Sequence, residues 1–190
     1  MKRKVIVAGP AGVGKTTVLN EFRKIVEQEN LPLRLVNYGT MMLNTAKDVV
    51  KDRDSLRKAS SELQHKLQKK AAEAIVANKI DGLLLIDTHL IIRTQSGFMP
   101  GIPSPVLSTI SPELIAIIEA PADEILSRRM SDASRKRDEI LAQEVDKEIQ
   151  LSRAMASACS IISGIPVGII HNPAGGQHQA ALKLFEMIKA

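Results

Sequence analysis

The chain has 190 residues, of which 44% are hydrophobic and 25% are charged. This length is enough for one full-sized hydrophobic core and too short for two ordinary domains. The apolar runs are too short to span a bilayer, and only about five apolar residues follow the basic start, fewer than a signal peptide needs. We therefore expect a cytoplasmic protein, in which the single cysteine, Cys159, excludes a disulfide framework and a cysteine-rich zinc site.

The charge and the aromatic content narrow the class of ligand. The formal net charge is +5, and aromatic residues make up 2% of the chain. A positive balance favours polyanionic ligands such as phosphates, nucleotides or RNA. The shortage of aromatic rings argues against a stacking platform for single-stranded nucleic acid. Small phosphorylated molecules are therefore the ligands that we expect, with neither a membrane nor a nucleic acid as partner.

Apolar runs alternate with longer periodic segments in the first part of the chain. Strands are predicted at residues 4–8 and 33–37, and helices over residues 16–29, from residue 39, and over residues 55–78. The uninterrupted apolar run at residues 82–86 is typical of a central strand in a parallel sheet. Residues 93–111 contain three prolines and two glycines, so we expect a long loop there.

The second part of the chain continues this alternation. It predicts strands at residues 114–119 and 166–170, a helix that opens at Pro121, a polar arginine-rich break at 131–138, and helices over 139–163 and 177–189. Five strands that alternate with helices predict a doubly wound α/β domain with a five-stranded parallel sheet and helices on both faces. Ligands of such sheets bind at the carboxyl ends of the strands, where we look for chemistry.

A glycine-rich segment joins the first strand to the first helix. It fits the pattern G-x-x-x-x-G-K-[ST] and consists of Gly9, Pro10, Ala11, Gly12, Val13, Gly14, Lys15, Thr16 and Thr17. Glycines let backbone N–H groups turn toward a phosphate, and the helix N-terminus adds its positive end. Lys15 can reach the β- and γ-phosphates, and the Thr16 hydroxyl can ligate Mg²⁺. The segment therefore predicts a site for a Mg-nucleoside triphosphate.

An acidic residue follows the predicted central strand. Asp87 stands where phosphate-loop proteins place a carboxylate that holds the metal or its waters. His89 can contact phosphate or water, or cap the loop, and both interpretations stay open. The segment 78–81 matches the guanine-reading pattern N-K-x-D, but it follows a helix and precedes a strand. We interpret it as a polar helix exit, which disfavours a GTPase.

Two groups of arginines suggest a second phosphate-bearing substrate. Arg53 and Arg57 are four residues apart and share one helical face if the helix extends back that far, so they could grip a terminal phosphate. A solvated charged face is the alternative. The second group is Arg128, Arg129, Arg135 and Arg137. In a polar segment between two helices, these side chains predict a closing lid for phosphoryl transfer.

The chain resembles the archaeal-type adenylate kinases, a branch of the nucleoside monophosphate kinases. The resemblance rests on the phosphate loop and on V-N-Y-G-T at 36–40, D-R-D at 52–54 with R-K at 57–58, D-T-H at 87–89, G-F-M-P-G-I-P at 97–103, and the arginines of 128–138. It covers nearly the whole chain. It implies the reaction ATP + AMP ⇌ 2 ADP with Mg²⁺, and a homotrimer, which is frequent in this branch.

The resemblance also implies roles for individual residues. Residues 9–17 hold the ATP phosphates, Lys15 acts in catalysis with Arg129, Arg135 and Arg137, and the metal is held by Thr16 and, through water, by Asp87. The AMP side consists of Tyr38, Thr40, Arg53, Arg57 and His89. The implied core comprises residues 1–38, 80–127 and 140–190, with an AMP-binding insert at about 39–79 and a short lid at about 128–139.

Three alternatives stay open at this level. The first is another nucleoside monophosphate kinase, for UMP or CMP, because the base of the acceptor has no sequence signature. The second is an adenylate-kinase-like ATPase that acts as an RNA-associated or assembly factor, which the pI of about 9.4 and the D-x-H pattern make conceivable. The third is a regulatory module that binds ATP and transfers nothing.

Overall fold

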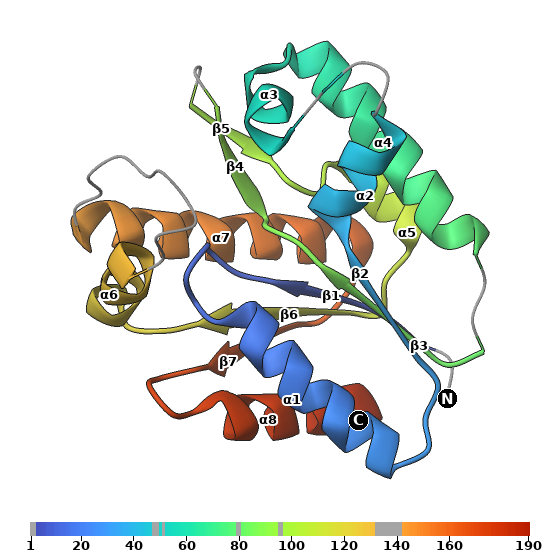
Figure 1. The fold of residues 1–190 in the computed structure, drawn as a ribbon. Coiled ribbons are helices and arrows are strands. Elements are labelled where there is room, and N and C mark those ends of the chain that lie inside the picture. The colour runs from blue at the N-terminus through green and yellow to red at the C-terminus, as the bar shows by residue number, and fades with distance from the viewer. Residues whose placement is uncertain (1–2, 47–49, 51, 79–80, 95–96, 132–141) are drawn as a thin grey trace.

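The computed structural model describes residues 3–46, 50, 52–78, 81–94, 97–131 and 142–190. A parallel sheet forms its centre, with the strand order β2-β3-β1-β6-β7. These strands are β1 (Arg3–Ala8), β2 (Leu33–Asn37), β3 (Leu83–Asp87), β6 (Leu114–Glu119) and β7 (Val167–His171). The predicted five-stranded parallel sheet is therefore confirmed (Figure 1).

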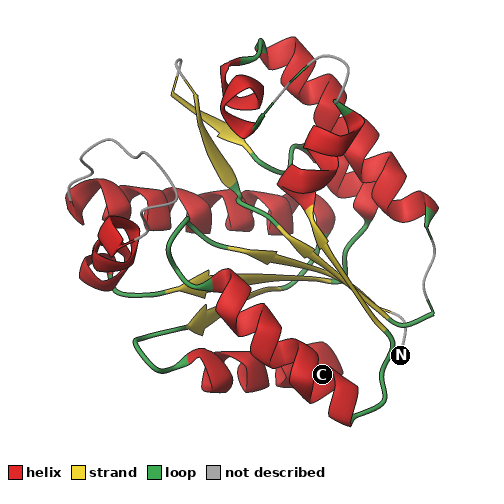
Figure 2. Ribbon diagram, viewed as in Figure 1, coloured by secondary structure: helices red, strands yellow, loops and turns green. Residues whose placement is uncertain are grey.

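Helices cover both faces of the sheet (Figure 2). One face carries α1 (Lys15–Gln28) and α8 (Gln177–Lys189), which pack against each other. The other face carries α2 (Tyr38–Thr45), α4 (Ser61–Ala77), α5 (Ser104–Ile110) and α7 (Ala142–Ser163). The helix α6 (Ala122–Ser131) follows β6 and packs against α7.

The alternation of side chains along the strands explains these two layers. In β1, Val5 and Val7 belong to the core under α1 and α8, whereas Ile6 and Ala8 belong to the opposite core. The apolar residues of β3 are buried on both faces, as the uninterrupted run predicted. No helix within the described ranges combines the length and the apolar character that a membrane crossing needs.

The predicted helix over residues 55–78 is divided in the structure. The short helix α3 (Arg53–Lys58) ends before Ala59, whose backbone is extended, and α4 begins after Ser60. The Ser60 side chain accepts a hydrogen bond from the backbone N–H of Leu63, which caps the new helix. The prediction of one long helix was wrong because this local cap competes with continuation of the helix. At the other end, α4 stops at Ala77 with Asn78 as its C-cap, so the N-K-x-D pattern begins where a helix ends, as predicted. Residues 79 and 80 lie outside the described residues.

The predicted long loop at residues 93–111 contains regular structure instead. An antiparallel hairpin is formed by β4 (Ile91–Thr94) and β5 (Gly97–Pro100), and α5 follows. The three prolines fall at the end of β5 and at the start of α5, where a missing N–H is tolerated. The hairpin rises from the carboxyl end of β3, and β4 packs against α3 and α7 (Figure 1).

Candidate active site

The phosphate-loop segment lies between β1 and α1 as the sequence predicted. Gly12 and Gly14 have φ angles of 91° and 83°, a left-handed conformation that favours glycine. A Cβ atom added at Gly14 would lie 2.6 Å from Nδ2 of Asn172, so a side chain has no room there. Gly14 is also the N-cap of α1, which places the positive end of that helix at the loop. This geometry suits an anion held by backbone N–H groups.

Lys15 lies over the loop with its ammonium group held in place. Its side chain is largely buried, with the residue 8% exposed, and Nζ donates to the carbonyl of Gly9 at 2.8 Å. His89 reaches the same carbonyl, since its Nδ1 lies 2.8 Å from the Gly9 oxygen. A carbonyl only accepts, so this nitrogen carries the ring proton. His89 therefore meets the donor loop directly, although the resemblance placed it on the AMP side.

Asp87 is the last residue of β3, at the edge of the sheet where the loop lies. Its Oδ2 accepts a hydrogen bond from Nδ2 of Asn37 at 2.8 Å. Its Oδ1 is buried and has no hydrogen-bond partner among the described residues. Asn37 also caps α2, since its Oδ1 accepts from the backbone N–H and the hydroxyl of Thr40 at 2.9 and 3.0 Å. Asn37, a residue of the V-N-Y-G-T motif for which we predicted no role of its own, thus orients the carboxylate.

Tyr38 lies in the core. Its ring is 2% exposed, and its hydroxyl donates to the backbone carbonyl of Gln68 on α4 at 2.6 Å. Burial raises the pKa of this hydroxyl. The polar end of Tyr38 is therefore used within the fold, and its expected place on the AMP side stays a prediction. Thr40 lies in the first turn of α2, and its side chain is exposed.

The replacement Tyr38→Phe separates these two roles. It removes the hydroxyl and leaves the buried Gln68 carbonyl without its donor, so we expect the free energy of unfolding to fall by about 1–2 kcal/mol. Because the hydroxyl faces the core, the KM for AMP should change less than about twofold. Thermal unfolding and initial rates at varied AMP measure both effects. A rise in this KM with unchanged stability would contradict the structural role.

The arginines of the expected acceptor site and lid are described only in part. Arg53 and Arg57 both lie in α3, so the helix does extend back as far as their spacing required. Arg135 and Arg137, with nearly all of the predicted arginine-rich break, lie outside the described residues. Their roles toward substrate stay predictions.

Arg129 lies against the phosphate loop. It is 7% exposed, its Nε donates to the carbonyl of Ala11 at 2.8 Å, and its Nη2 pairs with Glu148 Oε2 on α7 at 2.5 Å. Arg129 follows Ile125 by one turn of α6 and shares its buried face, so it packs toward the loop. Its expected role at the lid stays a prediction. The neighbouring Arg128 also contacts the loop, donating to the Val13 carbonyl at 3.3 Å.

Two further contacts at this edge of the sheet were missed. Asn172, directly after β7 and 3% exposed, donates from Nδ2 to the Val13 carbonyl at 2.7 Å. Glu119, at the end of β6, receives two hydrogen bonds from Arg153 of α7, at 2.8 and 2.6 Å. These bonds raise the pKa of Arg153. The partners are far apart in sequence and belong to no motif, so only the position of Asn172 and Glu119 at strand ends could have indicated them.

Known proteins are similar to this chain in sequence. Residues 8–146 match the protein family described as "AAA domain". The chain is 36% identical over 192 residues, covering 100% of both proteins, to a protein of Methanocaldococcus jannaschii named adenylate kinase. It is 39% identical over 170 residues to the adenylate kinase of Methanothermobacter thermautotrophicus, covering 88% of this chain and 89% of that protein.

A solved structure extends the comparison to the fold. Shikimate kinase from Acinetobacter baumannii, in complex with shikimate, superposes with a TM-score of 0.64 over 99% of this chain and 93% of that chain. The sequence identity is 13%, so this likeness concerns the fold alone. The sequence identity to the two archaeal adenylate kinases is much higher, at 36% and 39%, and it extends over most or all of the chain. In this chain, the phosphate loop with Lys15 and the carboxylate of Asp87 lie at one edge of the sheet. The chain therefore belongs to the adenylate kinase family of archaeal type, within the phosphate-loop nucleoside monophosphate kinases.

Proposed function

We propose that the protein catalyses the Mg²⁺-dependent, reversible transfer of the γ-phosphoryl group of ATP to AMP, which yields two ADP. The observation that carries this proposal is the convergence of the phosphate loop, the buried Lys15 ammonium and the carboxylate of Asp87 at one edge of the sheet. Its family relatives named adenylate kinase supply the acceptor, AMP.

In this mechanism, the protein positions the reactants and compensates charge. The loop N–H groups and the N-terminus of α1 would hold the ATP phosphates, and Lys15 would lie beside the oxygens on which charge develops. The phosphate of AMP is already an oxyanion, so no residue has to remove a proton from it. Thr40, Arg53 and Arg57 would hold the acceptor, and Arg135 and Arg137 would close over the transferred group and exclude water.

The residues present fit a magnesium ion. Asp87 Oδ1 is a buried carboxylate oxygen that has no partner in the described part of the chain, and carboxylate oxygen is a ligand that Mg²⁺ prefers. Within the described ranges, no three His, Cys, Asp or Glu residues gather as a metal cluster. A site of one carboxylate, through water, with the Thr16 hydroxyl matches the few protein ligands that Mg²⁺ usually takes beside substrate phosphates. When bound, the ion would neutralise phosphate charge during transfer.

The compartment and the oligomeric state of the protein belong to this proposal. We propose that the protein acts in the cytoplasm, where both nucleotides are available, and as a homotrimer, as the resemblance to the archaeal branch implies. Size-exclusion chromatography with light scattering measures the oligomeric state directly. A monomeric mass would remove the trimer from the proposal and leave the reaction untouched.

A coupled assay of ADP formation tests the reaction. With ATP and Mg²⁺, we expect rapid ADP formation with AMP, and rates at least about tenfold lower with CMP, UMP or GMP. Two adenosines joined through five phosphates should inhibit competitively against both ATP and AMP, because such a compound spans both sites. Turnover that needs no acceptor would instead indicate an ATPase, and a preference for UMP or CMP would indicate another kinase of the same class.

A further inference from the structure

The carbonyl groups of the phosphate loop accept hydrogen bonds from side chains of several elements. Gly9 accepts from Lys15 and His89, Ala11 accepts from Arg129, and Val13 accepts from Asn172 and Arg128. A loop that turns its N–H groups toward an anion turns carbonyls outward, and a buried carbonyl needs a donor. The shape of the loop therefore depends on these donors as well as on its glycines.

Arg129 is a buried donor whose charge is paired with a carboxylate. Its stem packs on the loop, since a Cβ atom added at Gly12 would lie 3.0 Å from Arg129 Cγ. Its guanidinium is buried, and a buried cation is strongly unfavourable without a counter-charge. Among the described residues, Glu148 is the one carboxylate that pairs with it. Glu148 belongs to the 22-residue helix α7, so a rigid element sets the direction of the guanidinium.

We propose that Glu148 is a positioning residue for the ATP phosphates: it fixes the Arg129 guanidinium on the Ala11 carbonyl and so keeps the phosphate loop in its binding shape. Glu148 acts through Arg129 and does not touch the nucleotide. The inference rests on the proposed use of this loop for ATP. It also links the start of α7, directly after the expected lid, to the donor site.

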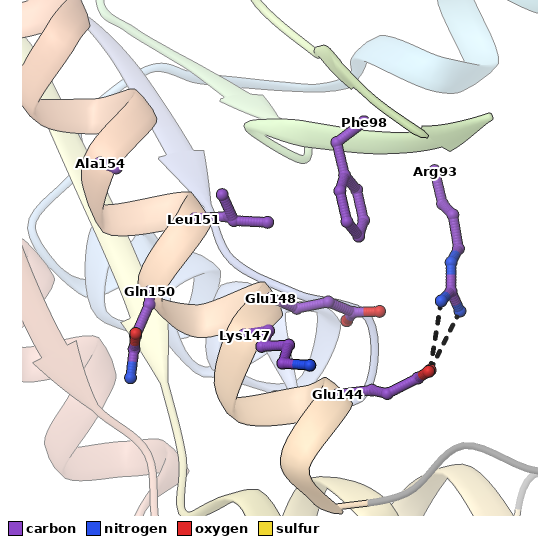
Figure 3. Close-up of a pocket in the computed structure, with 8 residues that line it drawn as sticks. All are labelled: Arg93, Phe98, Glu144, Lys147, Glu148, Gln150, Leu151 and Ala154. Atoms are coloured by element: carbon purple, nitrogen blue, oxygen red, sulfur yellow. Dashed lines mark hydrogen bonds and ion pairs between the residues drawn. The ribbon is translucent and has the colours of Figure 1, made fainter. Parts of the chain in front are cut away.

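Helix α7 provides a matched control one turn away. Glu144 also pairs with an arginine, Arg93 of the hairpin, at 3.2 Å (Figure 3). This pair is half-exposed, at 54% for Arg93 and 40% for Glu144, and it lies across a hollow of about 690 Å³ that Phe98 and Leu151 also line (Figure 3). Both described hydrogen bonds of the Arg93 guanidinium go to Glu144, whereas Arg129 also donates to a carbonyl of the phosphate loop. Glu144→Gln thus removes a similar charge from the same helix without disturbing the support of the loop.

The experiment compares Glu148→Gln with Glu144→Gln in the full chain, by calorimetric titration with ATP and, separately, with AMP. We expect Glu148→Gln to weaken ATP binding about tenfold or more, because a charged hydrogen bond that orients the arginine is lost. Its affinity for AMP should stay within about twofold, and Glu144→Gln should leave both affinities within about twofold. A loss of affinity for both nucleotides alike would indicate general damage and would overturn the proposal.

A double-mutant cycle tests whether the effect passes through Arg129. In an Arg129→Met background, adding Glu148→Gln should change the ATP affinity by less than about twofold, because nothing is left to position. Glu148→Asp retains the charge and should therefore bind ATP more tightly than Glu148→Gln. If circular dichroism shows that Glu148→Gln does not fold, Glu148→Asp replaces it in the comparison with the wild type. An unchanged or tighter affinity of Glu148→Gln for ATP, or an undiminished effect in the Arg129→Met background, would overturn the inference. A wild-type protein that fails to bind ATP would refute the proposed function instead.

Discussion

Lys15→Ala is expected to lower the rate of phosphoryl transfer roughly a thousandfold while the fold is retained. Lys15 supplies the one side-chain cation of residues 9–17, and a preorganised charge beside the transferred group is worth this order of magnitude. The fold should tolerate the change because the Gly9 carbonyl, which accepts from Lys15, also accepts from His89. Single-turnover ADP formation and thermal unfolding measure the two consequences separately.

Lys24→Ala is the matched control for this change. Lys24 lies on the same helix, α1, but its ammonium is exposed and pairs with Glu21 at 2.6 Å. This contact lowers the pKa of Glu21, and an exposed pair of this kind contributes little to stability. We expect wild-type kinetics from Lys24→Ala. Turnover near the wild-type rate in Lys15→Ala would refute the assignment of residues 9–17 as the ATP site.

Local patterns predicted the part of the site that lies on one stretch of chain. The phosphate loop needs glycines, a lysine and a helix start in succession, and all are adjacent in the sequence. The position of Asp87 followed from the apolar run before it, since a run of that length between helices is a central strand with a defined carboxyl end. The final helix was predicted with the bounds Gln177–Lys189 that the structure gives.

The remainder depends on partners that the sequence does not place side by side. Arg129 appeared as one of several arginines in a polar segment, and only the packing of α6 on α7 brings it to Glu148. Asn172 is 159 residues from Val13, whose carbonyl it supports. Tyr38 belongs to a sequence motif, but the direction of its side chain depends on the backbone carbonyl of Gln68 in α4, which accepts its hydroxyl. The three prolines predict a loop, although Pro100 ends β5 and the other two lie at the start of α5.

Asp87→Asn is expected to reduce the transfer rate about a hundredfold at fixed Mg²⁺ and to raise the Mg²⁺ concentration needed for half-maximal rate. The carboxylate keeps one oxygen on Asn37, while the other is buried with no partner in the described part of the chain. When no cation is bound, a charged oxygen in this position lowers the stability of the fold, because it has lost its hydration. The neutral amide removes the charge from this buried position, and its oxygen can still accept from Asn37. We therefore expect an unchanged or higher melting temperature together with the loss of activity.

Opposite changes in activity and stability distinguish a metal-holding carboxylate from a structural one. Asp146→Asn provides the comparison, because Asp146 is an exposed acid of α7 and not a residue of the proposed metal site. It should leave the Mg²⁺ dependence and the melting temperature as they are in the wild type. A structural Asp87 would instead lower the melting temperature when replaced by asparagine and would leave the Mg²⁺ dependence unaltered. That outcome would remove Asp87 from the proposed metal site, since the orphaned oxygen would then serve the fold and not the ion.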